Sequence, residues 1–305
     1  MPSAQTAAPT NTCRGTMRWF LRLLSSIRFD EVLVLQGTPL LGAFFSMGAI
    51  TAGKCLDVFV LAVASCCLVA HVFLLNDWSG ANTDLLDPNR AAHVFTARGI
   101  GSRAVGTLCI LLLAASLALL APFGATPLLL ALVIAVLSTL YSAPKLAMKG
   151  VPLANSVLHL LGGLAHFLLG YSMFHVLDWR GVGIGSFFAL TFAAGHLTHE
   201  ARDCASDALN GIETNAVKFG AARNLVAGFL LFTVADVLLV ALAATEMVPR
   251  ILLLVAVAYP FHLGWTLEAW NAGLGYQNIE RLKQRYRALY AIIGVAMALA
   301  TRLAG

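Results

Sequence analysis

Three carboxylates in the second half of the sequence have a helical spacing. Glu200, Asp203 and Asp207 are three and four residues apart, so on a helix they share one face. Carboxylates on one face repel each other unless a cation lies between them. Mg²⁺ suits such oxygen ligands, and it usually binds one or two carboxylates together with phosphate oxygens of a substrate. This segment therefore predicts a magnesium site for a phosphorylated substrate.

A second acidic segment lies earlier in the chain. Asp77 and Asp84 are seven residues apart, Asp87 follows three residues later, and Asn76 adds a neutral oxygen ligand. Two such clusters facing each other would hold Mg²⁺ around a diphosphate and neutralise its charge as it leaves. Departure of diphosphate from an allylic carbon creates a carbocation that an electron-rich acceptor captures. The alternative, solvated loop charges, does not explain two spaced clusters at matching helix ends.

Basic side chains close to both segments complement this chemistry. A guanidinium group binds two phosphate oxygens at once, whereas an ammonium group acts as a point charge. His199 precedes the second cluster, where we expect it to orient a carboxylate or to accept a proton from the acceptor. The cations that we expect to contact diphosphate are Arg90, Lys145, Lys149 and Arg202.

The composition places this chemistry in a membrane. The chain has 305 residues, of which 59% are hydrophobic and 11% are charged, whereas soluble domains carry roughly 25% charged residues. The basic residues form no tract with interleaved aromatic residues, so no nucleic acid partner is expected. None of the 6 cysteines lies in a zinc-binding spacing.

Nine apolar stretches approach the roughly 20 residues that a membrane-spanning helix needs. Because lipid cannot satisfy an irregular backbone, the expected fold is an all-α integral membrane bundle. Pro39 is expected to kink the first helix. The expected spans are 32–53, 56–76, 104–123, 126–142, 151–176, 181–199, 224–245, 250–268 and 286–303.

The basic residues are divided unequally between the two ends of these spans. Both acidic segments and most of the basic residues fall on the side of the N-terminus. The positive-inside rule makes that side cytoplasmic, in what we expect to be a bacterial inner membrane. All of the 20 Lys and Arg residues lie on that side except Lys54, Arg180, Arg250 and Arg302.

The order of the segments also predicts the organisation of the chain. The acidic segments follow the second and sixth spans, four helices apart, which predicts two related four-helix halves plus a ninth helix. Residues 1–16 are polar, without an apolar run, and are expected to form a disordered cytoplasmic tail. Residues 17–305 are then one membrane-embedded domain.

The motifs resemble those of the UbiA superfamily of intramembrane prenyltransferases. The first family motif, NDxxDxxxD, is matched by Asn76, Asp77 and Asp84. The second, DxxDxxxDxxxGxxTxxVxxG, is matched in register by Glu200, Asp203, Asp207, Gly211, Thr214, Val217 and Gly220, with Glu in place of the first Asp. A Tyr-Ser-x-Pro signature that ends in Lys is matched by Tyr141, Ser142, Pro144 and Lys149, with Asn155 beyond it.

The resemblance covers residues 20–303 and implies nine helices around a cavity that binds a prenyl diphosphate with Mg²⁺. It implies that Asn76, the aspartates of both motifs and Glu200 hold the metal, with Asp87 and Asn155 in support. Tyr141 would hydrogen-bond near the leaving group. One departure is Gly80, which stands where the first motif has its second Asp, so a metal ligand is lost there.

These observations favour an enzyme that transfers a prenyl group to a small acceptor, which we expect to be aromatic. One alternative is a cyclase that acts on the prenyl diphosphate alone, since the same metal site serves both reactions, and Gly80 favours it slightly. A second alternative is transfer to a non-aromatic lipid acceptor. A non-enzymatic transporter or scaffold gives no reason for two carboxylate clusters on one side of the membrane.

Overall fold

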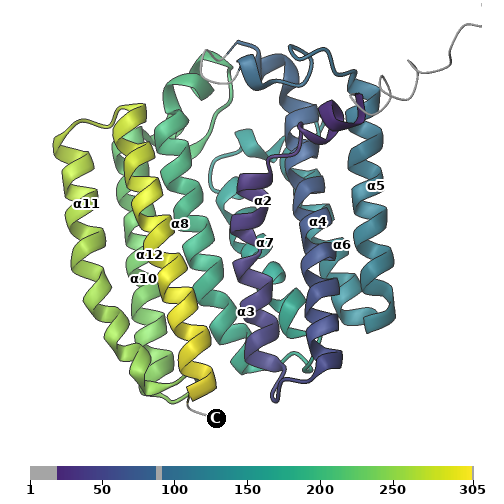
Figure 1. Cartoon of the computed structure of the whole chain (residues 1–305). Helices are drawn as coiled ribbons and strands as arrows, with labels where there is room; N and C mark the ends of the chain where they lie inside the picture. Colours follow the sequence, from purple (N-terminus) through teal and green to yellow (C-terminus); the bar gives the residue numbers. More distant parts are fainter. Residues whose placement is uncertain (1–18, 87–90, 304–305) are drawn as a thin grey trace, which may run out of the picture.

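The computed structural model describes residues 19–86 and 91–303 and is an all-α bundle (Figure 1). Asp87, Arg90 and the expected tail at 1–16 lie outside the described residues. The helices of the first half are α2 (Phe29–Leu35), α3 (Gly37–Ser46), α4 (Ala52–Asp84), α5 (Ser102–Leu120) and α6 (Ala125–Ser142). Those of the second half are α7 (Ala154–Tyr171), α8 (Trp179–Leu209), α9 (Asn215–Phe219), α10 (Ala221–Ala244), α11 (Tyr259–Asn271) and α12 (Tyr276–Leu303).

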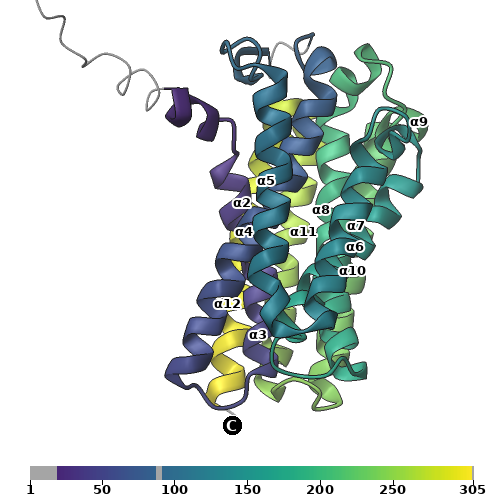
Figure 2. The same ribbon diagram turned by 90° about the vertical axis from the view of Figure 1, so that its right-hand side faces the viewer.

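Short 3₁₀ helices connect several of these elements. They are η1 (Ala91–His93), η2 (Ala121–Phe123), η3 (Met148–Gly150) and η4 (Arg250–Ala258). The expected eighth span is therefore η4 followed by α11, and α12 begins well before the expected start at residue 286. Among the described residues, 7 helical segments are long and apolar enough to cross a membrane. The expected spans 32–53 and 151–176 correspond to the pair α2–α3 and to α7, which lie within the same bundle (Figures 1 and 2).

The first expected span is divided at Gln36, between α2 and α3. Pro39 lies in the first turn of α3 and cannot donate a hydrogen bond to the carbonyl one turn earlier, in α2. The kink expected at this proline is thus a break between two helices. Helix α2 lies above α3 in Figure 1.

Glycines allow α3 to cross α7 at very short range. A Cβ atom on Gly42 would lie 2.2 Å from the carbonyl oxygen of Phe167, and one on Gly170 would lie 1.8 Å from that of Pro39. Small residues at such crossings let helix backbones approach each other in membranes. The crossing fixes the first half of the bundle against the second, with Phe45, Phe167 and Tyr171 packed beside it.

The two helices that carry the acidic segments are longer than a membrane is thick. With 33 residues in α4 and 31 in α8, they extend roughly 50 and 46 Å, whereas the hydrocarbon core is about 30 Å thick. Both helices end at the same end of the bundle, the upper end in Figure 1. Their last turns can therefore carry carboxylates beyond the hydrocarbon.

Candidate functional site

The structure places the described carboxylates of both acidic segments on the last turns of long helices, as their spacing predicted. Asp77 and Asp84 belong to α4, and Glu200, Asp203 and Asp207 belong to α8. Here and below, the motif of α4 is called the first acidic motif and that of α8 the second. The loops around them explain two glycines of the second motif, since Gly211 and Gly220 have φ of 67° and 95°, which favour glycine.

Glu200, at the start of the second motif, lies in a buried network of asparagines. Its carboxylate is 5% exposed. Asn155 at the start of α7 donates to Oε1, and Asn215 of α9 and Asn224 of α10 donate to Oε2 at 2.9 and 3.3 Å. Asn215 also donates to Oδ1 of Asn155 at 2.7 Å. These bonds satisfy the carboxylate without a metal, and they tie three helices to α8.

Asp203 is held by its neighbour on α8. The Arg202 Nε lies 2.6 Å from Asp203 Oδ1, and Nη2 lies 2.8 Å from Oδ2, so the guanidinium takes both oxygens. Nη1 of the same group donates to Glu280 of α12 at 2.5 Å, and the group lies over the ring of Tyr276. Arg202 is therefore paired with two carboxylates, those of Asp203 and Glu280. From the sequence we expected this residue to contact diphosphate.

The pairs continue from Glu280 to α2. Lys283, on the next turn of α12, lies 3.5 Å from Glu280 and 3.4 Å from Glu31 of α2. Arg287 lies 2.6 Å from the other oxygen of Glu31. Burial alone would raise the pKa of Glu31, but the hydrogen bonds and charges of Arg287 and Lys283 outweigh it and lower that pKa. A chain of ion pairs thus links the second motif to α2.

The first motif is connected to α2 directly. Arg28, the residue before α2, donates to both oxygens of Asp77, with Nε 3.0 Å from Oδ2. Its side chain is 40% exposed, against 17% for Asp77. In the sequence Arg28 is only one of the basic residues on the side of the N-terminus, because nothing in the spacing of residues 28 and 77 relates them.

Lys149 reaches the position where the first motif lacks an acid. A Cβ atom on Gly80 would meet Lys149 Nζ and Asp84 Oδ2, each at 3.5 Å. The carbonyl of Lys149 accepts a bond of 3.2 Å from Asn155, which also binds Glu200. Lys149 and Asn155, both expected from the sequence, therefore connect the two motifs.

The backbone around Lys149 is unusual for its residue types. Ala147 and Leu153 have φ of 37° and 66°, a left-handed region that costs energy for residues with side chains. The amide of Leu153 donates to Asn215 Oδ1 at 2.7 Å, which helps to hold this conformation. Lys145, by contrast, is exposed in the loop before η3.

A stack of rings adjoins the second motif inside the bundle. His159 of α7 and His196 of α8 lie face to face, with ring centroids 3.6 Å apart. Tyr141 of α6 packs edge-on against His159 at 4.9 Å, and His196 Nε2 lies 3.2 Å from Glu200 Oε1. His199, expected to act beside the motif, has its Nε2 buried without a hydrogen-bond partner.

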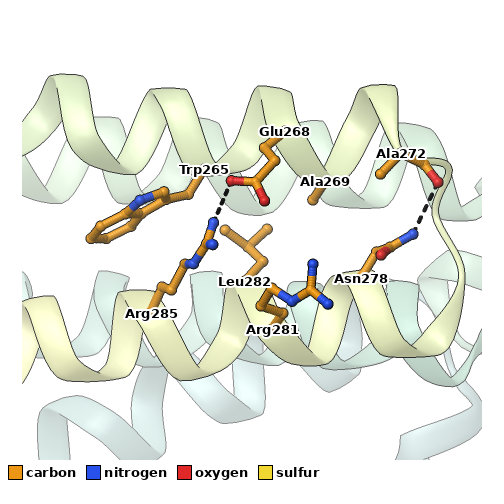
Figure 3. Close-up of a pocket in the computed structure, with 8 residues that line it drawn as sticks. All are labelled: Trp265, Glu268, Ala269, Ala272, Asn278, Arg281, Leu282 and Arg285. Atoms are coloured by element: carbon orange, nitrogen blue, oxygen red, sulfur yellow. Dashed lines mark hydrogen bonds and ion pairs between the residues drawn. The ribbon is translucent and has the colours of Figure 1, made fainter.

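Among the described residues, no three Asp, Glu, His or Cys side chains converge as a preformed metal site. A pocket between α11 and α12 also lacks such a set (Figure 3). Its carboxylate, Glu268, pairs with Arg285 across the pocket. Helix α12 thus has two charged sides, with Arg281 and Arg285 toward α11 and Glu280 and Lys283 toward α8 and α2.

Comparison with known proteins defines the class to which this fold and site belong. The model of the UbiA prenyltransferase family matches residues 37–273, so the chain belongs to that family and is a multi-pass membrane enzyme of the prenyltransferase class. The family resemblance inferred from the motifs is thereby confirmed. No curated protein matches the sequence.

Several solved structures share the fold over nearly their whole length. A UbiA homologue from Archaeoglobus fulgidus bound to DMAPP and Mg²⁺ is 20% identical, with a TM-score of 0.66, covering 90% of this chain and 99% of the homologue. A structure of digeranylgeranylglyceryl phosphate synthase is 15% identical, with a TM-score of 0.70 and coverages of 93% and 99%. An apo UbiA homologue from Aeropyrum pernix K1 is 17% identical, with a TM-score of 0.68 and coverages of 90% and 98%.

Proposed function

We propose that this enzyme transfers an isoprenoid chain from a prenyl diphosphate to a small acceptor in the membrane, with Mg²⁺ as cofactor. The observation that carries the proposal is the position of two acidic motifs at one end of the bundle, connected through Lys149 and Asn155. The similar A. fulgidus homologue, with both DMAPP and Mg²⁺ bound, supports the same substrate class here.

The donor set fits Mg²⁺ held jointly by protein and substrate. Asp77 and Asp203 already bind a cationic group with both oxygens, and no closed cage of three ligands is present in the described residues. Mg²⁺ usually binds one or two carboxylates and completes its shell with phosphate oxygens and water. The proposed ligands are Asn76, Asp77, Asp84, Asp203 and Asp207.

Glu200 takes a different role in this proposal. Both of its oxygens accept hydrogen bonds from asparagine side chains, so we assign it to positioning of the second motif and not to metal binding. This replaces the ligand role that the family resemblance implied for Glu200. The other oxygen ligands remain at each motif, and their assignment is unchanged.

The chemistry requires charge neutralisation at the leaving group and an apolar surface around the cation. Bound Mg²⁺ supplies Lewis-acid stabilisation of the diphosphate as the C–O bond breaks. Lys149 supplies a point charge between the motifs, and Tyr141 lies at the ring stack next to Glu200. The new bond forms between the allylic carbon and the acceptor, and an aromatic acceptor then loses a proton.

We propose an aromatic acceptor because the stacked rings of His159 and His196, with Tyr141 edge-on beside them, form an aromatic surface suited to a flat molecule. A non-aromatic lipid acceptor is the second candidate, favoured by the fold shared with digeranylgeranylglyceryl phosphate synthase, whose product contains a glyceryl phosphate. We place the motifs on the cytoplasmic side of a bacterial inner membrane, because 16 of the 20 Lys and Arg residues share their side.

The test is an assay in proteoliposomes with radiolabelled prenyl diphosphates of several lengths, with Mg²⁺ or with EDTA. We expect Mg²⁺-dependent consumption that Asp203→Ala reduces at least about a hundredfold, as loss of an electrostatic stabiliser does. The matched control is Asp57→Ala, which removes an acid at the opposite end of α4 and should leave the rate unchanged.

The acceptor requirement separates the alternatives. Consumption that needs a phenolic or quinone precursor supports the aromatic acceptor, and consumption that needs a glyceryl phosphate lipid supports the second candidate. A cyclic hydrocarbon formed without any acceptor would replace both with the cyclase. If wild-type protein consumes no prenyl diphosphate under any of these conditions, the proposed function is wrong.

A further inference from the structure

Arg28 and Arg202 bind the two acidic motifs in the same way. In each pair Nε binds one carboxylate oxygen and Nη2 binds the other, on Asp77 and on Asp203 respectively. A guanidinium bound through two parallel hydrogen bonds is a strong partner for a carboxylate. Each motif therefore has an arginine bound to one of its proposed metal ligands.

The two arginines differ in how firmly they are held. Arg202 also binds Glu280, lies over the ring of Tyr276 and has a side chain 11% exposed. Arg28 precedes a short helix whose side chains Phe29 and Leu33 are 51% and 61% exposed, and its own side chain is 40% exposed. Arg28 can thus leave its carboxylate by a change of side-chain rotamer, whereas Arg202 would also have to break the pair with Glu280.

A divalent cation on Asp77 would compete directly with Arg28, because the guanidinium occupies both oxygens that the metal would use. Once displaced, the same planar group matches the oxygens of a phosphate. We propose that Arg28 is a placeholder that holds Asp77 in the metal-free enzyme and transfers to the diphosphate when Mg²⁺ takes the carboxylate. This inference rests on the proposed function, and it adds a diphosphate-binding residue that the motifs do not contain.

If Arg28 exchanges in this way, its removal should change the affinity for a divalent cation and the affinity for diphosphate in opposite directions. Removal of the guanidinium removes a competitor for Asp77, so a divalent cation alone should bind more tightly, by about fivefold for a partly exposed pair. Diphosphate should bind more weakly, by about tenfold, because a charge-assisted hydrogen-bond partner is lost. A merely structural role for Arg28 would weaken both.

The experiment uses the full chain in nanodiscs, with Mn²⁺ in place of Mg²⁺. Electron paramagnetic resonance measures binding of Mn²⁺ alone, and calorimetry measures binding of inorganic diphosphate in the presence of Mg²⁺. The variants are Arg28→Gln and Arg28→Lys. Lysine keeps the positive charge but lacks the two parallel N–H donors of the guanidinium group. The matched control is Arg285→Gln, which breaks the pair with Glu268 across the pocket of Figure 3 and should change neither affinity.

Tighter Mn²⁺ and weaker diphosphate binding in Arg28→Gln support the exchange, with Arg28→Lys intermediate for diphosphate. If Arg28→Gln binds both Mn²⁺ and diphosphate more weakly, or if neither affinity changes, the proposed exchange is overturned, provided that the wild type binds both ligands and turns over. If Arg28→Gln does not fold, Arg28→Lys gives the same decision, since the bidentate contact is lost. A wild-type enzyme that turns over but binds no Mn²⁺ also overturns it, whereas one without turnover refutes the proposed function itself.

Discussion

The two acidic motifs occupy equivalent places on α4 and α8 but are built differently. Around the second motif, Glu200 accepts hydrogen bonds from α7, α9 and α10, and Arg202 ties Asp203 to α12. Around the first, Arg28 reaches Asp77 from an exposed position and Lys149 faces the glycine that replaces an acid. The second motif is thus fixed by buried contacts, whereas the first is held by groups that can move.

This difference has a mechanistic meaning. A buried carboxylate with all its partners in place is rigid, because each partner would lose a hydrogen bond if it moved. If the proposed function holds, a fixed second motif would position one side of the metal site before substrate arrives. An adjustable first motif would then close on the proposed metal and diphosphate, with binding energy used for positioning.

The largest expected effect is on stability, from Glu200→Ala. This change removes one of the acceptors of each buried amide that binds Glu200, those of Asn155, Asn215 and Asn224, and we expect a loss of about 3 kcal/mol. The contrast is Asp84→Ala in the first motif, where the partly exposed side chain should cost less than about 1 kcal/mol. Thermal unfolding in detergent measures both variants.

The isosteric variant Glu200→Gln is the control for packing. It keeps one acceptor oxygen and the side-chain volume, so its melting temperature should lie between those of wild type and Glu200→Ala. Equal losses for Glu200→Ala and Asp84→Ala would remove the distinction between a fixed and an adjustable motif.

Much of this arrangement could be predicted from the sequence. Apolar length predicted spans at 56–76 and 181–199, which α4 and α8 contain and extend by the turns that carry the acids, and the i, i+3, i+7 spacing placed the acids of α8 on one face of its last turns. The signature that includes Tyr141 also contains Lys149 and leads to Asn155, and in the structure these two residues lie next to residues of the acidic motifs. These predictions succeed because helical periodicity is a local property, set by residues within a few turns of each other.

The contacts between distant residues could not be predicted. Arg28 and Asp77 are 49 residues apart, and Lys283 and Glu31 are 252 apart, so only the packed bundle brings them together. Asn224 carried no signal, because a lone Asn in an apolar helix fits many interhelical contacts. The division at Gln36 was expected only as a kink at Pro39, since the sequence does not show where one helix ends and the next begins.

A smaller effect is expected from Gly80→Asp, which restores the missing acid of the first motif. The new Cβ would make ordinary contacts of 3.5 Å with side-chain atoms of Asp84 and Lys149, so it fits without displacement of the backbone. We expect half-saturation at an about fivefold lower Mg²⁺ concentration, because a further carboxylate reaches the metal, which corresponds to about 1 kcal/mol. The measurement is the Mg²⁺ dependence of the initial rate.

Gly80→Asn separates charge from shape. It has nearly the same volume but no negative charge, so it should leave the Mg²⁺ dependence close to that of wild type. If Gly80→Asp behaves like Gly80→Asn, the new acid pairs with Lys149 instead of the metal. The first motif would then pair with a lysine at this position, and an acid there would add no metal ligand.

The smallest expected effect concerns the link from the second motif to α2. The pKa of Glu31 is lowered in the folded protein by Arg287 and Lys283 against the opposing effect of burial. Its contribution to stability is therefore complete above the ordinary pKa of a glutamate and is lost as the pH falls through the lower folded value. Acidification from about pH 7 to about pH 4 should begin to weaken the anchoring of α2.

The comparison of wild type with Glu31→Gln isolates this contribution from that of other carboxylates. Glu31→Gln lacks the titrating group, so its melting temperature should fall less than that of wild type over the same pH change. Arg287→Gln should behave similarly, because it removes the ion pair that lowers the pKa. Parallel decreases in all three proteins would mean that Glu31 does not anchor α2, and that the connection between α2 and the site depends on Arg28 alone.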